Sequence, residues 1–321
     1  MEKARTAIAI LDDYQGVALQ SADWSRLEAD CTLSVFRDHV DDIDKLAERL
    51  RPFAVVCAMR ERTAFGRALL ARLPALKLIV TTGHWNAAID MDAAATLGIT
   101  VCGTRSNPHA APELTWALIL AALRNLPAET GSVRSGGWQV GVGGDLHGKT
   151  LAVLGLGRIG QSVTRVGLAL GMRVVAWSQN LTEAAAEAHG AALVTKDELF
   201  AQADVLTVHL KLSERTRGLV GARELALMRP HALLVNTARG PIVDEAALID
   251  ALAARRIGGA ALDVFDTEPL PVAHPLRTAP NALLTPHVGY VTQDTYRLFY
   301  GDTVEAIEMW RAGTPVHLLT K

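Results

Sequence analysis

The chain has 321 residues, enough for two domains, and its hydrophobic content of 50% supplies a core that needs neither disulfides nor metals. Acids and bases nearly balance at a formal net charge of -2, and no dense run of Lys and Arg occurs, so nucleic acids and anionic membranes are disfavoured as partners. The first apolar stretch is too short for a signal peptide, and the longest one, Trp116 to Leu123, is too short to cross a bilayer. We therefore expect a cytoplasmic globular protein.

The cysteines are three in number and widely spaced, at Cys31, Cys57 and Cys102. The last two lie inside apolar runs, as buried small hydrophobic residues do. We therefore expect buried thiols rather than a disulfide, a metal site or a nucleophile.

The first third of the chain alternates short apolar runs with stretches of helical spacing, which is typical of a parallel α/β domain. The helical spacing is clearest at 41–50 and 90–97. We place the first part of one domain at residues 1–103. The apolar runs are Thr6–Leu11, Ala54–Met59, Leu76–Val80 and Ile99–Cys102.

A long helix is predicted next, from Leu114 to Leu126, because Pro112 and Glu113 stand where a helix start favours proline and an acid. The segment from Ser132 to Gly148 is rich in glycine and predicts an irregular arm.

The sequence LAVLGLGRIG, from Leu151 to Gly160, predicts a buried strand that ends in the pattern G-x-G-x-x-G. Gly155 permits the tight turn, Gly157 lets a pyrophosphate approach the backbone, and Gly160 allows the following helix to pack on the strand. The helix N-terminus then offers N–H groups to the anion. A bound dinucleotide is the expected ligand.

Five more apolar runs follow, several of them separated by helical stretches such as Asp244 to Ala254. They predict a doubly wound parallel sheet at 104–284, and the residues 285–321, with a helix near 293–312, are expected to complete the first domain. The fold class is thus α/β, with two Rossmann-like doubly wound parallel-sheet domains of which the substrate domain is discontinuous. The five runs are Arg173–Trp177, Asp204–His209, Leu233–Asn236, Ala260–Val264 and Ala282–Leu284.

Polar side chains follow three of these strands, at Arg239, at Glu268 and at His287. Each of them alone has a structural explanation, as a sheet-edge cap, a solvated acid or a core histidine. Because parallel strands end at one edge of their sheet, we expect the three together to form a site near the nicotinamide end of the cofactor.

The sequence strongly resembles the D-isomer-specific 2-hydroxyacid dehydrogenases, through GLGRIG, HLKLSERTRGLV, MRPHALLVNTARGPIVDEAAL, ALDVFDTEPLP and LTPHVGY in the family's order. The resemblance implies that His287 is the proton donor, that Glu268 hydrogen-bonds its imidazole and favours the imidazolium, and that Arg239 holds the substrate carboxylate and polarises the carbonyl. The implied activity is reduction of a 2-keto acid to the D-2-hydroxy acid with NAD(P)H, a reaction on the CH–OH group when run in reverse.

The cofactor positions combine the glycine motif with positions that the resemblance implies, among them Asp263 beside the nicotinamide carboxamide. No metal is expected. The positions are Gly155, Gly157, Arg158, Ile159, Gly160, Ser178, Gln179, Asn180, His209, Thr237, Ala238, Asp263 and Gly289.

One departure from the family concerns the cofactor. NAD-binding members place an acid after the second strand of this sheet, whereas here Trp177 is followed by Ser178, Gln179 and Asn180. No carboxylate repels a 2′-phosphate, although no Arg or Lys stands beside these residues to neutralise it. We expect NADP(H), with NAD(H) tolerated.

A second departure lies in the loop after Gly83, whose backbone amides receive the substrate carboxylate in the family. Here His84 and Trp85 stand where small residues are usual, which either narrows the pocket or lines it for an aromatic substrate; alternatively, Trp85 packs between domains. Arg60 and Arg62 match basic positions that contact substrate in phosphoglycerate-type members. The expected substrate-binding residues are Arg60, Gly83, His84, Arg239 and His287.

The resemblance also implies a homodimer. In reductases of this family a tryptophan of the arm reaches the partner's active site, and Trp138 could do so; plain dimer packing is the other interpretation.

Two alternatives to a 2-keto acid reductase stay open. One is a 3-phosphoglycerate dehydrogenase, and the other is a peptide-binding corepressor on the same fold. A formate dehydrogenase is disfavoured, because it pairs its histidine with glutamine where this chain has Glu268.

Overall fold

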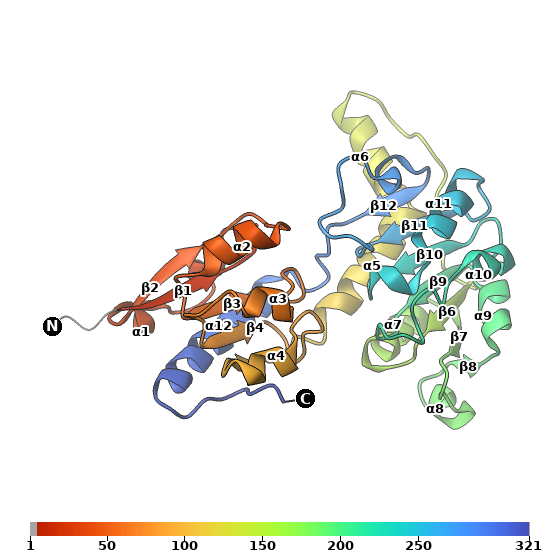
Figure 1. Cartoon of the computed structure of the whole chain (residues 1–321). Coiled ribbons are helices and arrows are strands. Elements are labelled where there is room, and N and C mark those ends of the chain that lie inside the picture. Colours follow the sequence, from red (N-terminus) through yellow and green to blue (C-terminus); the bar gives the residue numbers. More distant parts are fainter. Residues whose placement is uncertain (1–4, 321) are drawn as a thin grey trace. The chain divides into compact units, whose positions relative to one another are not determined.

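The computed structural model describes residues 5–320 and divides the chain into two compact units (Figure 1). Unit 1 runs up to Asn107 and resumes at Val291, whereas unit 2 spans Pro108–Tyr290. The boundaries expected from the sequence, 103/104 and 284/285, fall a few residues earlier. Residues 1–4 and 321, the outer ends of the expected first and last segments, lie outside the described residues. None of the helices within 5–320 is long and apolar enough to cross a membrane.

Unit 1 contains a five-stranded parallel sheet of order β2-β1-β3-β4-β5. The order in which the strands are added reverses between β1 and β3, and open α/β sheets bind their ligands at such a switch point. The strands are β1 (Thr6–Ile10), β2 (Cys31–Val35), β3 (Val55–Ala58), β4 (Leu78–Thr81) and β5 (Thr100–Cys102).

Helices cover both faces of this sheet. The helices α2 (Ile43–Leu50), α3 (Arg67–Leu70) and α4 (Met91–Thr96) pack their buried residues on one face. The side chains of Asp42 and Asp90 cap α2 and α4 by accepting backbone N–H groups. The short α1 (Ser25–Glu28) lies against α12 (Gln293–Arg311), and η1 (Ala18–Gln20) precedes them.

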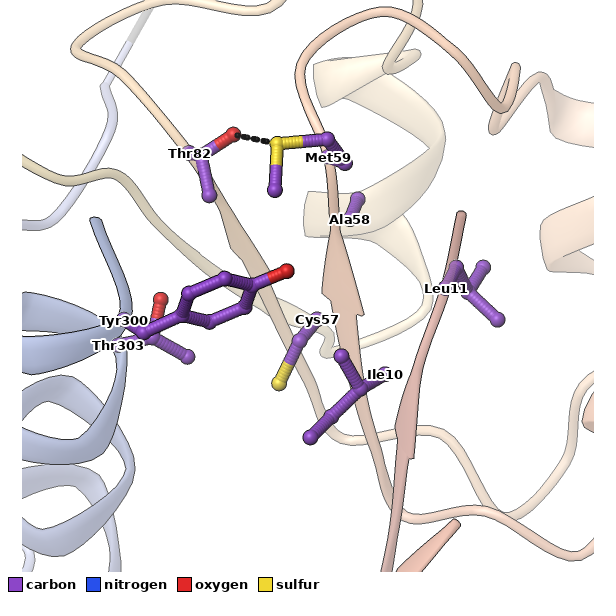
Figure 2. A pocket seen from close by; sticks show the side chains of 8 residues that line it. All are labelled: Ile10, Leu11, Cys57, Ala58, Met59, Thr82, Tyr300 and Thr303. Atoms are coloured by element: carbon purple, nitrogen blue, oxygen red, sulfur yellow. Dashed lines mark hydrogen bonds between the residues drawn. The ribbon is translucent and has the colours of Figure 1, made fainter. Parts of the chain in front are cut away.

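The helix α12 packs against β4, so the end of the chain completes unit 1. In Figure 2 the ring of Tyr300 reaches from α12 toward Cys57 and Ile10 of the sheet. These residues enclose a gap that leaves no room for a water molecule, which marks it as packed core rather than a ligand pocket. Cys31, Cys57 and Cys102 are buried and free, and burial raises the pKa of Cys102 to about 11.

Unit 2 contains a seven-stranded parallel sheet of order β12-β11-β10-β9-β6-β7-β8. This is the order of a dinucleotide-binding sheet, with its switch point between β6 and β9. The strands are β6 (Thr150–Leu154), β7 (Arg173–Trp177), β8 (Ala192–Leu193), β9 (Val205–Val208), β10 (Leu233–Asn236), β11 (Gly259–Leu262) and β12 (Ala282–Leu284).

Two helical layers sandwich this sheet, so its strands are apolar on both faces. One layer holds α5 (Ala110–Leu123), α7 (Arg158–Ala169) and α8 (Glu183–Glu187). The other holds α9 (Lys196–Gln202), α10 (Ala222–Leu227) and α11 (Glu245–Ala253). The two 3₁₀ turns are η2 (Gly240–Ile242) and η3 (Pro275–Thr278).

The long helix expected from Leu114 to Leu126 is wrong in its extent. The structure has two helices, α5 and α6 (Leu126–Arg134), separated at Asn125, whose φ of 50° is left-handed. Pro127 in the first turn of α6 explains the break, because in a continuous helix its ring would clash with the carbonyl of Leu123 and it has no N–H to donate to that carbonyl. The arm is therefore helical up to Arg134 and irregular from there to the strand β6.

Candidate active site

Three neighbouring strands of unit 2 carry the three expected catalytic residues to one edge of the sheet. Asn236 at the end of β10 pairs with Leu262 of β11, which pairs with Leu284 of β12. Because the strands end in register, the loops that carry Arg239, Glu268 and His287 leave the sheet side by side.

Glu268 and His287 are in direct contact. The Nδ1 of His287 lies 2.5 Å from Oε2 of Glu268, and Oε1 of Glu268 accepts the backbone N–H of Phe265 at 2.9 Å. A carboxylate has no proton to donate, so Oε2 is the acceptor in this contact and Nδ1 of His287 is the donor that carries the proton. The remaining ring nitrogen, Nε2, is therefore the one that can exchange protons with a substrate.

The backbone at His287 is left-handed, with a φ of 52°. Asp263 holds this segment in place, because its buried carboxylate accepts N–H groups from Val288 and Gly289 at 2.8 Å each and the hydroxyl of Thr285 at 2.6 Å. Burial raises the pKa of Asp263, and the hydrogen bond from Thr285 opposes that shift. Asp263 and Gly289, both expected at the cofactor, thus also fix the position of the histidine.

Arg239 lies on a loop that the structure holds by hydrogen bonds at both ends. The side chain of Asn236 donates to the carbonyl of Arg239 at 2.9 Å and accepts the N–H of Ala238 at 3.0 Å. The hydroxyl of Thr237 lies 2.8 Å from that of Thr115 on α5. Thr237 and Ala238 therefore lie on the same loop as Arg239, at the carboxyl edge of the sheet.

The glycine turn after β6 has the geometry that its sequence predicts. Gly155 has a φ of 103°, and a Cβ on Gly160 would lie 2.1 Å from the carbonyl oxygen of Gly155. A Cβ on Gly157 would meet no atom within 4 Å, and Gly157 begins α7 without a side-chain cap. Gly155 and Gly160 pack against each other within the turn. Gly157 instead faces open space in front of a helix N-terminus, which suits a pyrophosphate. Arg158 and Ile159 form the first turn of that helix.

The segment Ser178–Asn180 lies beside this turn, because the N–H of Gly155 donates to the carbonyl of Trp177 at 2.9 Å. His209 follows β9 on the other side, where a Cβ on Gly155 would touch its backbone. Burial lowers the pKa of His209 to about 3, so this imidazole is neutral at working pH. It can offer a hydrogen bond there but no positive charge.

Unit 1 gathers the expected substrate-binding residues Arg60, Gly83 and His84. The guanidinium of Arg60 lies directly over Gly83, so close that a Cβ would sit 1.9 Å from Nη1, and Gly83 has a φ of 93°. The N–H of Gly83 already donates to the hydroxyl of Thr104 at 2.7 Å. The Nδ1 of His84 lies 3.0 Å from the hydroxyl of Ser106.

The other residues singled out in the sequence differ in exposure. The guanidinium of Arg62 lies 4.4 Å from the ring of Tyr14 and donates to the carbonyl of Asp12 at 2.6 Å, so it serves the packing of unit 1. Trp85 is 44% exposed and Trp138 is 74% exposed.

Sequence reasoning missed a hydrogen-bonded cluster, here named the Asp12 cluster, of Asp12, His39, Asp41 and Thr63 at the carboxyl edge of the unit 1 sheet. The buried Asp12 has a φ of 56°, lies 2.9 Å from Nδ1 of His39 and accepts the hydroxyl of Thr63 at 2.7 Å. The Nε2 of His39 lies 2.9 Å from Asp41. Both ring nitrogens thus face carboxylates, and the hydrogen bond to Asp12 raises the pKa of His39.

Within residues 5–320, Asp302, Glu305 and His317 offer one ligand atom each within 4.8 Å of one another. Both oxygens of Asp302 already accept hydrogen bonds from Arg105, at 2.6 Å and 2.8 Å. A cation there would lie against a guanidinium, which opposes its binding.

A histidine that presents Nε2 at the same sheet edge as a dinucleotide turn suits proton transfer coupled to hydride transfer. This combination defines the class of nicotinamide-dependent oxidoreductases.

The comparisons with known proteins make this class more specific. The family model described as "D-isomer specific 2-hydroxyacid dehydrogenase, NAD binding domain" matches residues 116–289. The glyoxylate reductase of Aeropyrum pernix is 40% identical over 237 residues, which is 71% of each chain. The crystal structure of a phosphoglycerate oxidoreductase from Vibrio cholerae O395 superposes with a TM-score of 0.92 at 39% identity, covering 96% of this chain and 99% of that one.

The D-3-phosphoglycerate dehydrogenase of Methanocaldococcus jannaschii is 38% identical over 258 residues, 79% of this chain, which spans only 49% of that relative. The chain belongs to the D-isomer specific 2-hydroxyacid dehydrogenase family. It is accordingly an oxidoreductase that interconverts 2-hydroxy and 2-keto acids with a nicotinamide cofactor.

Proposed function

We propose that this chain reduces a 2-keto acid to the D-2-hydroxy acid, with His287 as the proton donor. The observation that carries the proposal is the 2.5 Å contact between Nδ1 of His287 and Glu268, which leaves Nε2 as the reactive ring nitrogen. The same contact fixes the plane of the imidazole, and a reduction consumes the proton that Nε2 delivers.

The chain's own groups have distinct tasks in this proposal. Nε2 of His287 gives its proton to the oxygen that becomes the hydroxyl, and in the reverse direction it takes that proton back. Arg239 offers a planar fork of N–H donors that binds the substrate carboxylate and polarises the keto oxygen. Glu268 holds the imidazole plane in both protonation states.

The residues around the glycine turn fit a dinucleotide, since Gly157 leaves space where a side chain would block it. When bound, the cofactor supplies or accepts the hydride. The turn and the N-terminus of α7 would hold its pyrophosphate, and Asp263 and the Thr237–Ala238 backbone lie at the sheet edge near the expected nicotinamide position.

A substrate panel tests the proposal. Glyoxylate, hydroxypyruvate, pyruvate, phenylpyruvate and branched 2-keto acids are each assayed with NADPH and NADH, in the wild type and in His287→Ala. We expect turnover of at least one acid and a loss of about 10³-fold or more in kcat in the variant, with its circular dichroism spectrum unchanged. No turnover of any acid would favour a peptide-binding corepressor instead, and undiminished turnover in His287→Ala would remove the assigned role.

A second candidate is oxidation of D-3-phosphoglycerate. It is favoured by Arg60, whose guanidinium lies over the Gly83 loop and could bind a phosphate group. Turnover of D-3-phosphoglycerate with NADP⁺ or NAD⁺ that exceeds that of the unphosphorylated hydroxy acids, and that falls in Arg60→Gln, would establish this candidate over the first.

The proposed cofactor preference is NADP(H), with tolerance for NAD(H). It rests on Ser178, Gln179 and Asn180, which stand next to the glycine turn without a carboxylate that would repel a 2′-phosphate. The ratio of kcat/KM for NADPH and NADH measures this preference directly, and a strong preference for NADH would overturn it.

The proposed assembly is a cytoplasmic homodimer, and the three free thiols accord with a reducing compartment. An open groove of about 470 Å³ lies beside the arm of unit 2, and Leu120 and Leu170 on its walls are 42% and 37% exposed. Val142 and Trp138 on the arm add further exposed apolar surface that a second copy would cover. Light scattering measures the mass, and a Trp138→Ala enzyme that stays dimeric with an unchanged KM would exclude a role of this residue in the partner's active site.

A further inference from the structure

Glu245, the first residue of α11, contacts the loop that carries Glu268 at two points. Its Oε2 accepts the backbone N–H of Asp266 at 3.3 Å, and its Oε1 lies 3.0 Å from Nε2 of His274. Both side chains are mostly buried, with 18% of Glu245 and 17% of His274 exposed. The two contacts therefore hold both ends of the segment between Asp266 and His274.

The second hydrogen bond of His274 fixes its tautomer. Its Nδ1 accepts the N–H of Leu276 at 3.3 Å and thereby caps η3. A nitrogen that accepts cannot carry a proton, so the ring proton is on Nε2 and is donated to Glu245. Glu245 consequently serves as an acceptor in both of its contacts.

An independent contact seats the same loop. A Cβ on Gly240 would lie 2.1 Å from the carbonyl carbon of Phe265 and 2.6 Å from the nitrogen of Asp266. The residue after Arg239 thus packs its backbone directly against the peptide that leads to Glu268. The loops of the guanidinium and of the carboxylate are in this way built against each other, with α11 beginning a few residues later.

The chain of contacts continues to the imidazole. Phe265 donates its N–H to Glu268, whose other oxygen meets His287 at 2.5 Å. A shift of the Phe265–Asp266 peptide would therefore move the carboxylate relative to Nδ1, and hydrogen bonds weaken steeply with such misalignment.

We propose that Glu245 is a positioning residue for the reaction, acting through the 265–274 loop to hold Glu268 against His287, and that His274 is its partner in this task. The inference rests on the proposed roles of Glu268 and His287.

The charged groups that act on Asp266 are Glu245, Asp244 immediately before α11, His274 and Arg217. Burial first, and then the charge of Glu245, raises the pKa of Asp266, while Arg217 opposes the shift. Substitution of Glu245 by the neutral Gln therefore also reduces the repulsion on the carboxylate of Asp266. For this reason the melting temperature of the variant is measured together with its kcat.

The test compares Glu245→Gln, His274→Asn, their combination and two reference variants. A Gln side chain can accept only one of the two N–H groups and turns its own N–H₂ toward the other. Asn at 274 still caps η3 but is too short to reach Glu245. Glu183→Gln is the matched control, because Glu183 is also the first residue of a helix in unit 2 and is exposed. Glu268→Gln is the reference for a lost carboxylate.

We expect Glu245→Gln to lower kcat about tenfold with little change in KM for the cofactor. The pH profile of the reduction rate should change in the same direction as in Glu268→Gln but by less, because the contact between Glu268 and His287 is weakened rather than lost. His274→Asn should give a smaller loss of the same kind, and the double variant should lose less than the sum, since the two residues form one contact. Glu183→Gln should match the wild type.

A lower melting temperature in Glu245→Gln with an unchanged kcat and an unchanged pH profile would overturn the proposal, since it would show a merely structural role. Equal and additive effects of the two variants would overturn the pairing with His274. If His287→Ala retained turnover, the proposed function itself would fail, and this outcome is read from a separate variant. Should Glu245→Gln not fold, His274→Asn still decides, because an unchanged kcat and an unchanged pH profile in that variant would overturn the proposal.

Discussion

The carboxyl edges of the two sheets differ at the same topological position: the switch point is open in unit 2 and filled by side chains in unit 1. In unit 2 the switch point between β6 and β9 is lined by Gly155 and Gly157 and by a neutral His209, and Gly157 faces open space. In unit 1 the switch point between β1 and β3 is filled by the Asp12 cluster, whose carboxylates are bound by the chain's own donors. A switch point therefore supplies a place for a ligand, and the side chains decide whether the place is left open.

The largest effects are expected from substituting two glycines of the unit 2 turn, Gly160, which packs against backbone, and Gly157, which faces open space. In Gly160→Ala the new Cβ would meet the backbone oxygen of Gly155, which cannot move away, so we expect a loss of about 3 kcal/mol in unfolding free energy. In Gly157→Ala we expect unchanged stability but at least about a tenfold weaker binding of NADPH, because the methyl group enters the space left for the pyrophosphate.

Chemical denaturation and fluorescence titration with NADPH measure the two quantities. Gly131→Ala is the control, because Gly131 lies in α6 with nothing within 4 Å of its added Cβ, and it should leave both unchanged or slightly raise the stability. Equal losses of binding in Gly157→Ala and Gly131→Ala would contradict the assignment of the turn.

Ser178→Asp should increase the difference between the two sheet edges, because it adds a negative charge beside the open glycine turn of unit 2. A carboxylate beside the glycine turn would repel a 2′-phosphate, and about 1.4 kcal/mol of repulsion shifts the ratio of kcat/KM toward NADH about tenfold. Steady-state kinetics with both cofactors measures the shift. Ser178→Ala controls for the lost hydroxyl, and an unchanged ratio in the Asp variant would place the ribose elsewhere.

His39→Gln should break the closed edge of unit 1 in a pH-dependent way. The pKa of His39 is raised in the folded state, so its stabilisation is complete below the unfolded pKa of about 6.5 and is lost as the pH rises through the raised folded value. We expect a loss of about 2 kcal/mol at pH 5.5 that shrinks toward alkaline pH. Urea denaturation across pH 5.5 to about 9 measures it, with the exposed His189→Gln as the control. A difference that grows with pH would contradict the imidazolium.

The smallest effect is expected at Tyr300, behind that edge. Its buried hydroxyl has no hydrogen-bond partner and points into the gap that leaves no room for water (Figure 2). Tyr300→Phe should therefore be neutral or stabilising by about 1 kcal/mol in thermal unfolding. A clear destabilisation would show that the hydroxyl is satisfied in solution.

Most strands of both sheets could be predicted because they are buried on both faces and therefore read as continuous apolar runs. β2 was not predicted, since Thr32 and Ser34 interrupt its pattern at the sheet edge, and β8 has only two residues. The break at Asn125 was missed because the apolar composition continues across it, although Pro127 carried the signal.

For the site, the sequence predicted which strand ends would meet, and the contact of Glu268 with His287 has the expected partners. It could not predict the Asp12 cluster, whose members come from the ends of three strands without a spacing that a pattern would show. Nor could it predict that the amide of Gly83 is taken by Thr104, or that Gly240 packs on the Phe265–Asp266 peptide. Such contacts depend on how loops fold back, which residue periodicity does not encode.

The positive φ of His287 sets stability and activity against each other at one residue. Glycine would adopt this backbone with less strain, by about 1 kcal/mol or more. Glycine would also remove the imidazole and its contact with Glu268 and so erase the enzyme, which means that any effort to make this protein more robust has to hold position 287 fixed.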